Sequence, residues 1–148
     1  MEKLLSLHKH WITADAIKQV IFTGTDYKEN NAPPENMMEF AKMHSAFSRM
    51  AVMYGLIYVV IEGYRELELH DSRIDELLED EKYLDQLRLF RNATFHYQKQ
   101  PISEKELKFL EAEGAEHWIR ELHYSFQRFF ERVFPINEVM KLIKDGQI

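Results

Sequence analysis

The stretch ENMMEFAKMHSAFSRMAVMYGLIYVVIEGYREL, residues 35–67, is the longest helical pattern in the sequence. Its apolar residues recur at steps of three and four, the spacing that places side chains on one face of a helix. They form a main stripe with a second stripe beside it: Phe40, Phe47, Ala51, Tyr54, Tyr58 and Ile61, then Met43, Met50, Met53, Ile57 and Val60. An apolar arc this wide predicts a central helix with neighbours on most of its sides.

Further helical patterns lie on both sides of this segment. The expected helices cover residues 2–22, a short acidic segment capped by Asp71 or Ser72, 82–97, 103–134 and a short tail over 139–143. A loop, TGTDYKENNAPPEN (23–36), separates the first two helices, and Ser103 with Glu106 forms a capping-box pattern. Helices of this length with short connections predict an all-α fold, an antiparallel bundle of roughly four to five helices.

Size and composition favour a single domain over residues 1–148. Because there is no cysteine, disulfides, thiolate catalysis and cysteine-based zinc sites are excluded. The first residues lack the pattern of a secretory signal, and the apolar run at 51–64 is too short to span a bilayer. We therefore expect a cytoplasmic protein without membrane contacts. The net charge of −6 argues against DNA as a partner and restricts any RNA contact to a local patch.

Seven histidines raise the question of a metal site. Two ligands on one helix face need a spacing of three or four residues, but His8 and His10 are two apart and His117 and His123 are six apart. The di-iron signature of helical bundles needs glutamate three residues before histidine, and no histidine of this chain has one. We therefore expect no metal and no cofactor.

Two polar residues, His44 and Glu62, interrupt the main apolar stripe of residues 35–67. His44 is interpreted as a hydrogen-bonded histidine of the core or of an interface. A buried Glu62 would need a partner, and an arginine of the helix that carries Arg91 would fit a bundle. The alternative is an exposed glutamate near the helix end. A row of polar residues recurs at four-residue steps, at Glu113, His117 and Glu121. We interpret this row as a solvated or interhelical polar face.

The segment LRLFRNATFHYQKQP, residues 87–101, combines side chains suited to cleaving RNA without a metal. A neutral His96 can take the proton from a ribose 2′-hydroxyl, because imidazole exchanges protons near neutral pH. Arg91 can hold a phosphate and stabilise its charge in the transition state, and Asn92 can orient either group. Arginine and asparagine are also ordinary capping residues near a helix end.

The spacing of the motif restricts its geometry. Positions five apart on a regular helix differ by about 140° around the axis. Arg91 therefore points partly inward, whereas His96 shares a row with Arg88 and Asn92. Two arrangements remain open: the helix loosens near its end, or a second copy of the protein completes the site.

The segment LFRNATFHY resembles the signature of HEPN domains, helical bundles in which an arginine and a polar residue precede a histidine late in one long helix. The aromatic-rich ELHYSFQRFFERVF that follows is similar to the last long helix of that family. The resemblance implies a metal-independent endoribonuclease that dimerises through its motif helices, and a role in toxin–antitoxin or phage-defence systems. An RNA substrate and an antitoxin or regulatory protein are the implied partners.

Carried over to this chain, the resemblance makes Arg91, Asn92 and His96 the catalytic residues, with His96 as general base or acid. The residues expected to support that site or to bind the substrate are Glu62, Arg88, Tyr97 and Lys99. In family members whose tyrosine is modified by a partner enzyme, that tyrosine stands two positions after the histidine, whereas Tyr97 follows His96 directly. The alternative function is an inactive HEPN-like module that binds nucleotides or proteins.

Overall fold

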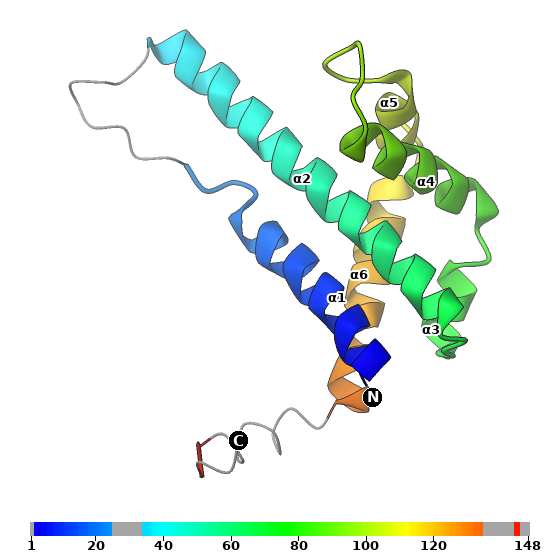
Figure 1. Ribbon diagram of the computed structural model, residues 1–148. Coiled ribbons are helices and arrows are strands. Elements are labelled where there is room, and N and C mark those ends of the chain that lie inside the picture. The colour runs from blue at the N-terminus through cyan, green and yellow to red at the C-terminus, as the bar shows by residue number, and fades with distance from the viewer. Residues whose placement is uncertain (1, 25–33, 135–143, 146–148) are drawn as a thin grey trace.

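The computed structural model of the protein describes residues 2–24, 34–134 and 144–145, and the described residues form six packed α-helices and no strand (Figure 1). The helices are α1 (Glu2–Val20), α2 (Glu35–Glu66), α3 (Ser72–Leu77), α4 (Glu81–Phe95), α5 (Glu104–Leu110) and α6 (Ala115–Val133). The predicted all-α bundle is confirmed. The expected tail helix at 139–143 and most of the loop at 23–36 lie outside the described residues.

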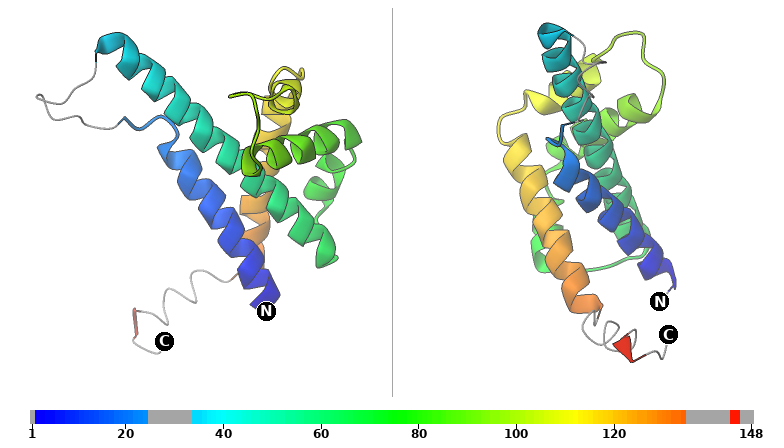
Figure 2. Two further views of the ribbon diagram at one scale, coloured as in Figure 1. Left: turned by 45° about the horizontal axis from the view of Figure 1, so that its top comes forward. Right: turned by 90° about the vertical axis from the view of Figure 1, so that its left-hand side faces the viewer.

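The core lies where the second half of α2 meets α1, α4 and α6. The α1 and α2 helices run antiparallel, and α6 packs behind them in the view of Figure 1 (Figure 2 shows the same packing from the side). The ring of Tyr64 on α2 meets Phe126 of α6 edge-on, with centroids 5.5 Å apart. Tyr54 meets Phe90 of α4 at 5.7 Å. Such aromatic burial supplies much of the driving force for folding.

The first half of α2 departs from the sequence prediction. Phe40 and Met43 are 64% and 65% exposed, and this end of the helix projects beyond its neighbours (Figures 1 and 2). At 1.5 Å per residue, the 32 residues of α2 span about 48 Å and the 19 residues of α1 only about 28 Å, so α2 outruns its partner. His44 is exposed there and stacks on Phe40, so a place in the core is wrong for it.

The single helix expected over 103–134 is divided in two. Its start is as predicted, because Ser103 and Glu106 form the capping box. At the break, Gly114 has φ +80°, in the left-handed region that glycine tolerates best. A Cβ at this position would lie 2.7 Å from the hydroxyl oxygen of Tyr83. The chain therefore turns at Gly114, and α6 begins in a new direction.

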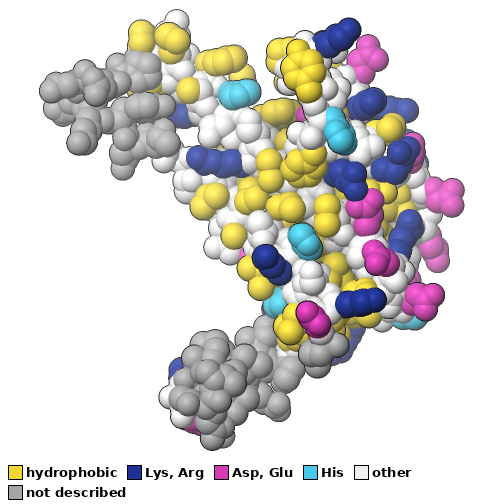
Figure 3. Space-filling view, viewed as in Figure 1, with side chains coloured by type: hydrophobic (Ala, Val, Ile, Leu, Met, Phe, Trp, Pro, Cys, Tyr) yellow, Lys and Arg dark blue, Asp and Glu magenta, His cyan; other side chains and the backbone are white. Residues whose placement is uncertain are grey.

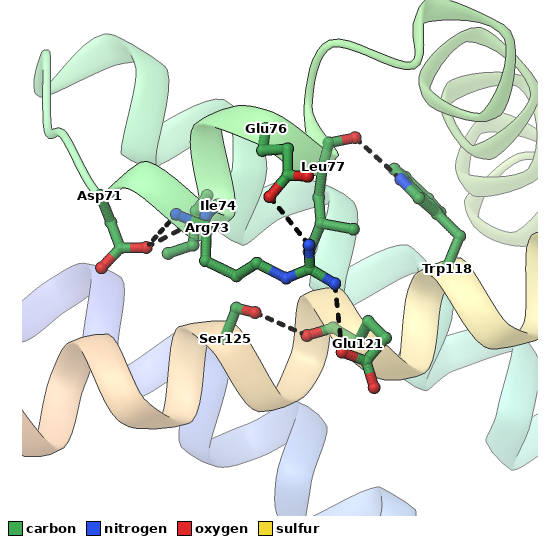
Figure 4. A network of polar contacts seen from close by, with 8 residues as sticks. All are labelled: Asp71, Arg73, Ile74, Glu76, Leu77, Trp118, Glu121 and Ser125. Carbon is green, nitrogen blue, oxygen red and sulfur yellow. Dashed lines mark hydrogen bonds and ion pairs between the residues drawn. The ribbon is translucent and has the colours of Figure 1, made fainter.

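Polar contacts hold α3 against α6 (Figure 4). The Asp71 carboxylate accepts hydrogen bonds of 3.0 Å from the backbone N–H groups of Arg73 and Ile74, so Asp71 is the cap of α3. The Arg73 guanidinium donates to the Glu121 carboxylate on α6 at 3.4 Å. The Trp118 indole N–H donates to a backbone carbonyl of α3 at 2.8 Å. Glu121 therefore lies on an interhelical polar face, as predicted.

Among the described helices, α2 alone is long and apolar enough, by length and composition, to cross a membrane. The apolar run 51–64, taken by itself as too short, is part of this longer helix. The core helix of a soluble protein meets the same criterion. The cytoplasmic location expected from the sequence stays a prediction.

Candidate functional site

The buried face of α4 determines where the R-N-x-x-x-H motif lies. Leu87 and Phe90 are fully buried, and the Phe90 ring packs against Phe109 of α5 with centroids 5.7 Å apart. Arg91 and Asn92 follow this face directly and are only partly buried. The core packing of α4 therefore sets both residues at the boundary between the core and the solvent.

Arg91 is held by three neighbours. Its Nη2 lies 2.6 Å from Oε2 of Glu62 on α2, and its Nη1 donates to Oδ1 of Asn92 at 2.9 Å. The guanidinium also stands over the ring of Tyr58, with its central carbon 5.5 Å from the ring centroid. Glu62 is therefore exposed near the end of α2, as the alternative interpretation had it, with its side chain 45% exposed, and it is nevertheless paired with an arginine of α4.

These contacts leave part of the guanidinium available. Of its five N–H groups, the two named bonds use two and the Nε–H is buried without a partner, so one N–H on each of Nη1 and Nη2 remains on a side chain that is 27% exposed. Burial, reinforced by the Glu62 carboxylate, raises the pKa of Tyr58, so its phenol is neutral at neutral pH. The result is a positioned cation that can still donate to an anion.

His96 has different surroundings. The α4 helix ends at Phe95, earlier than the predicted Tyr97, and His96 has extended backbone with φ −119° and ψ 145°. Its backbone N–H donates to the Asn92 carbonyl at 3.1 Å. The side chain is exposed and forms no hydrogen bond with any residue of the described part of the chain. The imidazole can therefore meet a molecule from solution.

A surface cavity of about 350 Å³ lies beside His96. His44 and Ser48 of α2 line its other side, and Gln98 and Gln100 line it from the segment after α4. The cavity thus brings His44 and His96 to one surface, while Arg91 is not part of its lining.

The close approach of Phe95 to α2 depends on Gly55. A Cβ at Gly55 would lie 2.5 Å from Cε2 of Phe95, inside any normal contact distance. Because glycine leaves this space, the end of α4 can rest on α2 immediately before His96.

The remaining predicted residues lie on the exposed side of α4 and after it. Arg88 is paired with Asp85 on the same helix, with Nη2 2.7 Å from Oδ1. Tyr97 is 91% exposed, and with the exposed Lys99 it lines a shallow cavity of about 330 Å³. Figure 3 shows charges of both signs over α3 and α4 and apolar side chains over α2, so this face has no uniformly basic surface.

The structure therefore brings the side chains of Glu62, Asn92 and Arg91 together, whereas the His96 side chain forms no hydrogen bond with any of them. One of the two arrangements predicted from the sequence was a helix that loosens near its end, and α4 does end before His96. The hydrogen bonds of Arg91 nevertheless go to Glu62 and Asn92. Tyr58 was missed as a neighbour of Arg91, although its spacing of four from Glu62 was a usable signal. No signal in the sequence indicated that His44 and His96 share a cavity.

Within the described residues, no group of three or more histidine, aspartate or glutamate side chains could hold a metal ion. The chain matches no family model, no curated protein and no solved structure. The function of this chain is therefore inferred from its own side chains.

Proposed function

We propose that the protein is a metal-independent endoribonuclease of the HEPN type that acts as a homodimer. The observation that carries this proposal is that the arginine and the histidine of one motif have different surroundings. Arg91 is held by Glu62 and Asn92 at the surface, while the imidazole of His96 is exposed five residues later. A positioned cation and an accessible proton acceptor are the two groups that RNA cleavage by transesterification needs.

In the proposed reaction, the neutral imidazole of His96 removes the proton of a ribose 2′-hydroxyl. The 2′-oxygen attacks the adjacent phosphorus, the bond from phosphorus to the 5′-oxygen breaks, and that oxygen takes up a proton from water, while the His96 imidazolium returns its proton to the hydroxide that is left. The products carry a 2′,3′-cyclic phosphate and a 5′-hydroxyl. Arg91 stabilises the charge on the phosphate oxygens, and Asn92 and Glu62 hold its guanidinium in place.

The homodimer is part of the proposal because Arg91 and His96 do not meet within one chain. A two-fold contact between α4 ends would place Arg91 of one copy near His96 of the other. Apolar surface for such a contact lies beside the motif, since Phe95 is 49% exposed and Tyr97 is 91% exposed. The resemblance adds a toxin–antitoxin or defence setting, with an antitoxin or regulatory protein as a further partner.

The test is cleavage of a labelled RNA in the presence of EDTA by the wild type and by the variants His96→Ala and Arg91→Ala. We expect His96→Ala to lower the rate by about 10²–10⁴-fold, the usual contribution of a positioned acid or base. Exposed residues of α6 provide matched controls, His117→Ala and Arg128→Ala, which should cleave like the wild type. Replacing the scissile ribose by 2′-deoxyribose should stop the reaction.

Equal cleavage by the wild type and both motif variants would contradict the proposal, as would cleavage that survives the 2′-deoxy substitution. Size-exclusion chromatography with light scattering tests the dimer separately. A monomer at the concentration at which RNA is cleaved would remove the two-chain part of the proposal.

A second candidate function is a non-catalytic interaction module, and the exposed first half of α2 favours it. Met37, Phe40 and Met43 are each at least 60% exposed and share one end of this helix. Exposed apolar groups gathered in this way are typical of protein contacts. This function predicts no RNA cleavage and a stable complex with a protein or nucleotide.

A further inference from the structure

A second cavity, of about 380 Å³, lies between the end of α1, the middle of α2, α5 and the first half of α6. It shares no lining residue with the cavity beside His96, and nothing in the proposed ribonuclease reaction uses it. The cavity is open to solvent on the side of Phe22, which is 91% exposed, and its volume reaches the range of pockets for small molecules, which begins at about 300 Å³. The wall of this apolar cavity is formed mainly by Phe22, Met50, Met53, Phe109, Leu110 and Ile119.

The wall of the apolar cavity is anchored at the end of α1. The Arg49 guanidinium of α2 donates to the Val20 carbonyl at 2.5 Å and to the Thr23 carbonyl at 2.8 Å. The Val20 carbonyl also accepts from the backbone N–H and the hydroxyl of Thr23, and the bonds from Arg49 hold this turn at the end of α1 against α2. The methionine side chains on α2 are flexible and can adapt to an irregular ligand.

The charges on the lining favour an anion. Lys18 and Arg120 are cations and Glu116 is an anion, so the lining carries a formal charge of 2 − 1 = +1. Glu116 is paired with Arg120, with Oε1 2.5 Å from Nη2. Lys18 has no carboxylate within ion-pair distance among the described residues, and its ammonium lies 4.4 Å from the ring centroid of Tyr124. Because Lys18 has no carboxylate partner there, its ammonium can pair with an anionic ligand in exchange for its contact with the Tyr124 ring.

A hydroxyl donor is present on the lining as well. Tyr54 is only 8% exposed, and its hydroxyl forms no hydrogen bond with another described residue. Burial, with a further contribution from Glu116, raises the pKa of Tyr54, so the hydroxyl keeps its proton. The Tyr54 hydroxyl is not among the fully buried unpaired atoms of the described residues, so a ligand oxygen that enters the cavity can reach it and accept its hydrogen bond.

His123 adds a neutral polar group to the wall. It is 1% exposed, its Nε2 lies 3.0 Å from Oδ1 of Asp15, and its Nδ1 has no partner among the described residues. Because the Asp15 carboxylate can only accept, Nε2 carries the proton. Burial lowers the pKa of His123 despite the bond to Asp15, which favours the neutral imidazole, so His123 adds no charge to the cavity.

We propose that the apolar cavity binds a small hydrophobic monocarboxylate, with its apolar body between Met50, Met53 and Ile119 and its carboxylate toward Lys18 and Tyr54. The size of the cavity, its apolar wall and its single unpaired cation together match this class of ligand. The site is independent of the proposed cleavage of RNA.

The probes are octanoate and 3-phenylpropanoate, with octan-1-ol as the neutral counterpart of octanoate. Isothermal titration calorimetry on the full chain should show one carboxylate bound per chain and weaker binding of the alcohol. Trp11 stacks on His123 with ring centroids 5.3 Å apart, so tryptophan fluorescence gives a second readout near the cavity.

Two kinds of variant test the position of the ligand. Lys18→Gln should weaken octanoate binding by about two- to fivefold, as expected for a partly screened charge. The control Lys9→Gln lies on the exposed side of the same helix and should bind like the wild type. Met50→Trp should fill the cavity and abolish binding, with the midpoint of urea unfolding as a check on its fold. Leu110→Trp, at a half-exposed position, replaces it if Met50→Trp does not fold.

Three results would overturn the proposal. The first is no binding of either carboxylate at millimolar concentration, and the second is equal affinity for octanoate and octan-1-ol. The third is octanoate binding that survives the folded filling variant.

Discussion

Two regions of this protein present polar groups to ligands in opposite ways. The motif surface, formed by Tyr58, Glu62, Arg91 and His96, is open and charged, and it is made by the packing of α4 on α2 alone. The apolar cavity is lined by four helices, and of its polar groups Tyr54 and His123 are buried, whereas Lys18 is partly buried and Glu116 and Arg120 are exposed. A surface of the first kind suits a large polyanion such as RNA, and a cavity of the second kind suits a small apolar molecule.

The two regions also share one structural element. Phe109 of α5 lines the apolar cavity and packs on Phe90 of α4, which directly precedes Arg91. Core packing is therefore common to both regions, whereas the chemistry of each is local. Substitutions should separate these contributions.

The largest effect is expected at the shared wall. Phe109 is fully buried and contacts the rings of Tyr54, Phe90 and Trp118. We expect Phe109→Ala to lower the free energy of unfolding by about 3–5 kcal/mol, through lost burial and the cavity left behind. Urea denaturation followed by circular dichroism measures this change.

The matched control is Leu107→Ala on the same short helix. Leu107 is 39% exposed, so its substitution should lower the unfolding free energy by less than about 1 kcal/mol. If both variants lowered the free energy of unfolding by similar amounts, Phe109 would stabilise the core no more than the exposed Leu107 does. Phe109 would then not be the packing element that the two regions share.

A smaller effect, confined to the motif surface, is expected at Glu62. If the proposed ribonuclease activity is present, Glu62→Gln should lower the cleavage rate by about 10–100-fold, because the Arg91 guanidinium loses its charged anchor. The unfolding free energy should change by less than about 1 kcal/mol, since the Glu62 side chain is 45% exposed. Cleavage kinetics and urea denaturation measure the two quantities.

Glu66→Gln, one helical turn further along α2 and exposed, is the control for the change of charge. Equal cleavage rates for the two variants would mean that Glu62 does not position Arg91 for the reaction.

The features that could be predicted from the sequence are the ones decided by neighbouring residues. The period of residues 35–67 predicts α2, and the S-x-x-E pattern predicts the capping box at Ser103 and Glu106, because both signals act within a few positions. The pairing of Glu62 with an arginine was expected only for a buried carboxylate, whereas Glu62 is exposed and paired all the same, so that argument does not explain the contact.

The features that were missed depend on distant contacts. Gly114 interrupts the single helix predicted over 103–134. The Tyr83 hydroxyl, from 31 positions earlier in the chain, occupies the space that a Cβ at Gly114 would need. The exposed start of α2 follows from the difference in length between α1 and α2, which periodicity does not reveal. The apolar cavity needs four separate segments to meet, so no short motif marks it.

The smallest expected effect concerns the histidine of the apolar cavity. Burial lowers the pKa of His123 below its ordinary value of 6.5, although its bond to Asp15 opposes the shift. Below pH 6.5 the unfolded chain therefore binds a proton that the folded chain resists, so the unfolding free energy falls as the pH decreases from 7.5 to 5.5. One proton changes it by less than about 1.4 kcal/mol per pH unit. His8, whose pKa burial also lowers, contributes in the same direction.

Urea denaturation at pH 7.5, 6.5 and 5.5 measures this dependence and separates the two regions. In His123→Gln, the amide can still donate to Asp15 but takes up no proton on unfolding, so the fall in unfolding free energy should become shallower, with the contribution of His8 remaining. In the matched variant His96→Gln, the buried His123 is intact, so the decrease should be retained. If His96→Gln flattened the dependence and His123→Gln did not, the acid-sensitive histidine would lie at the motif surface, and the contrast between the two regions would be reversed.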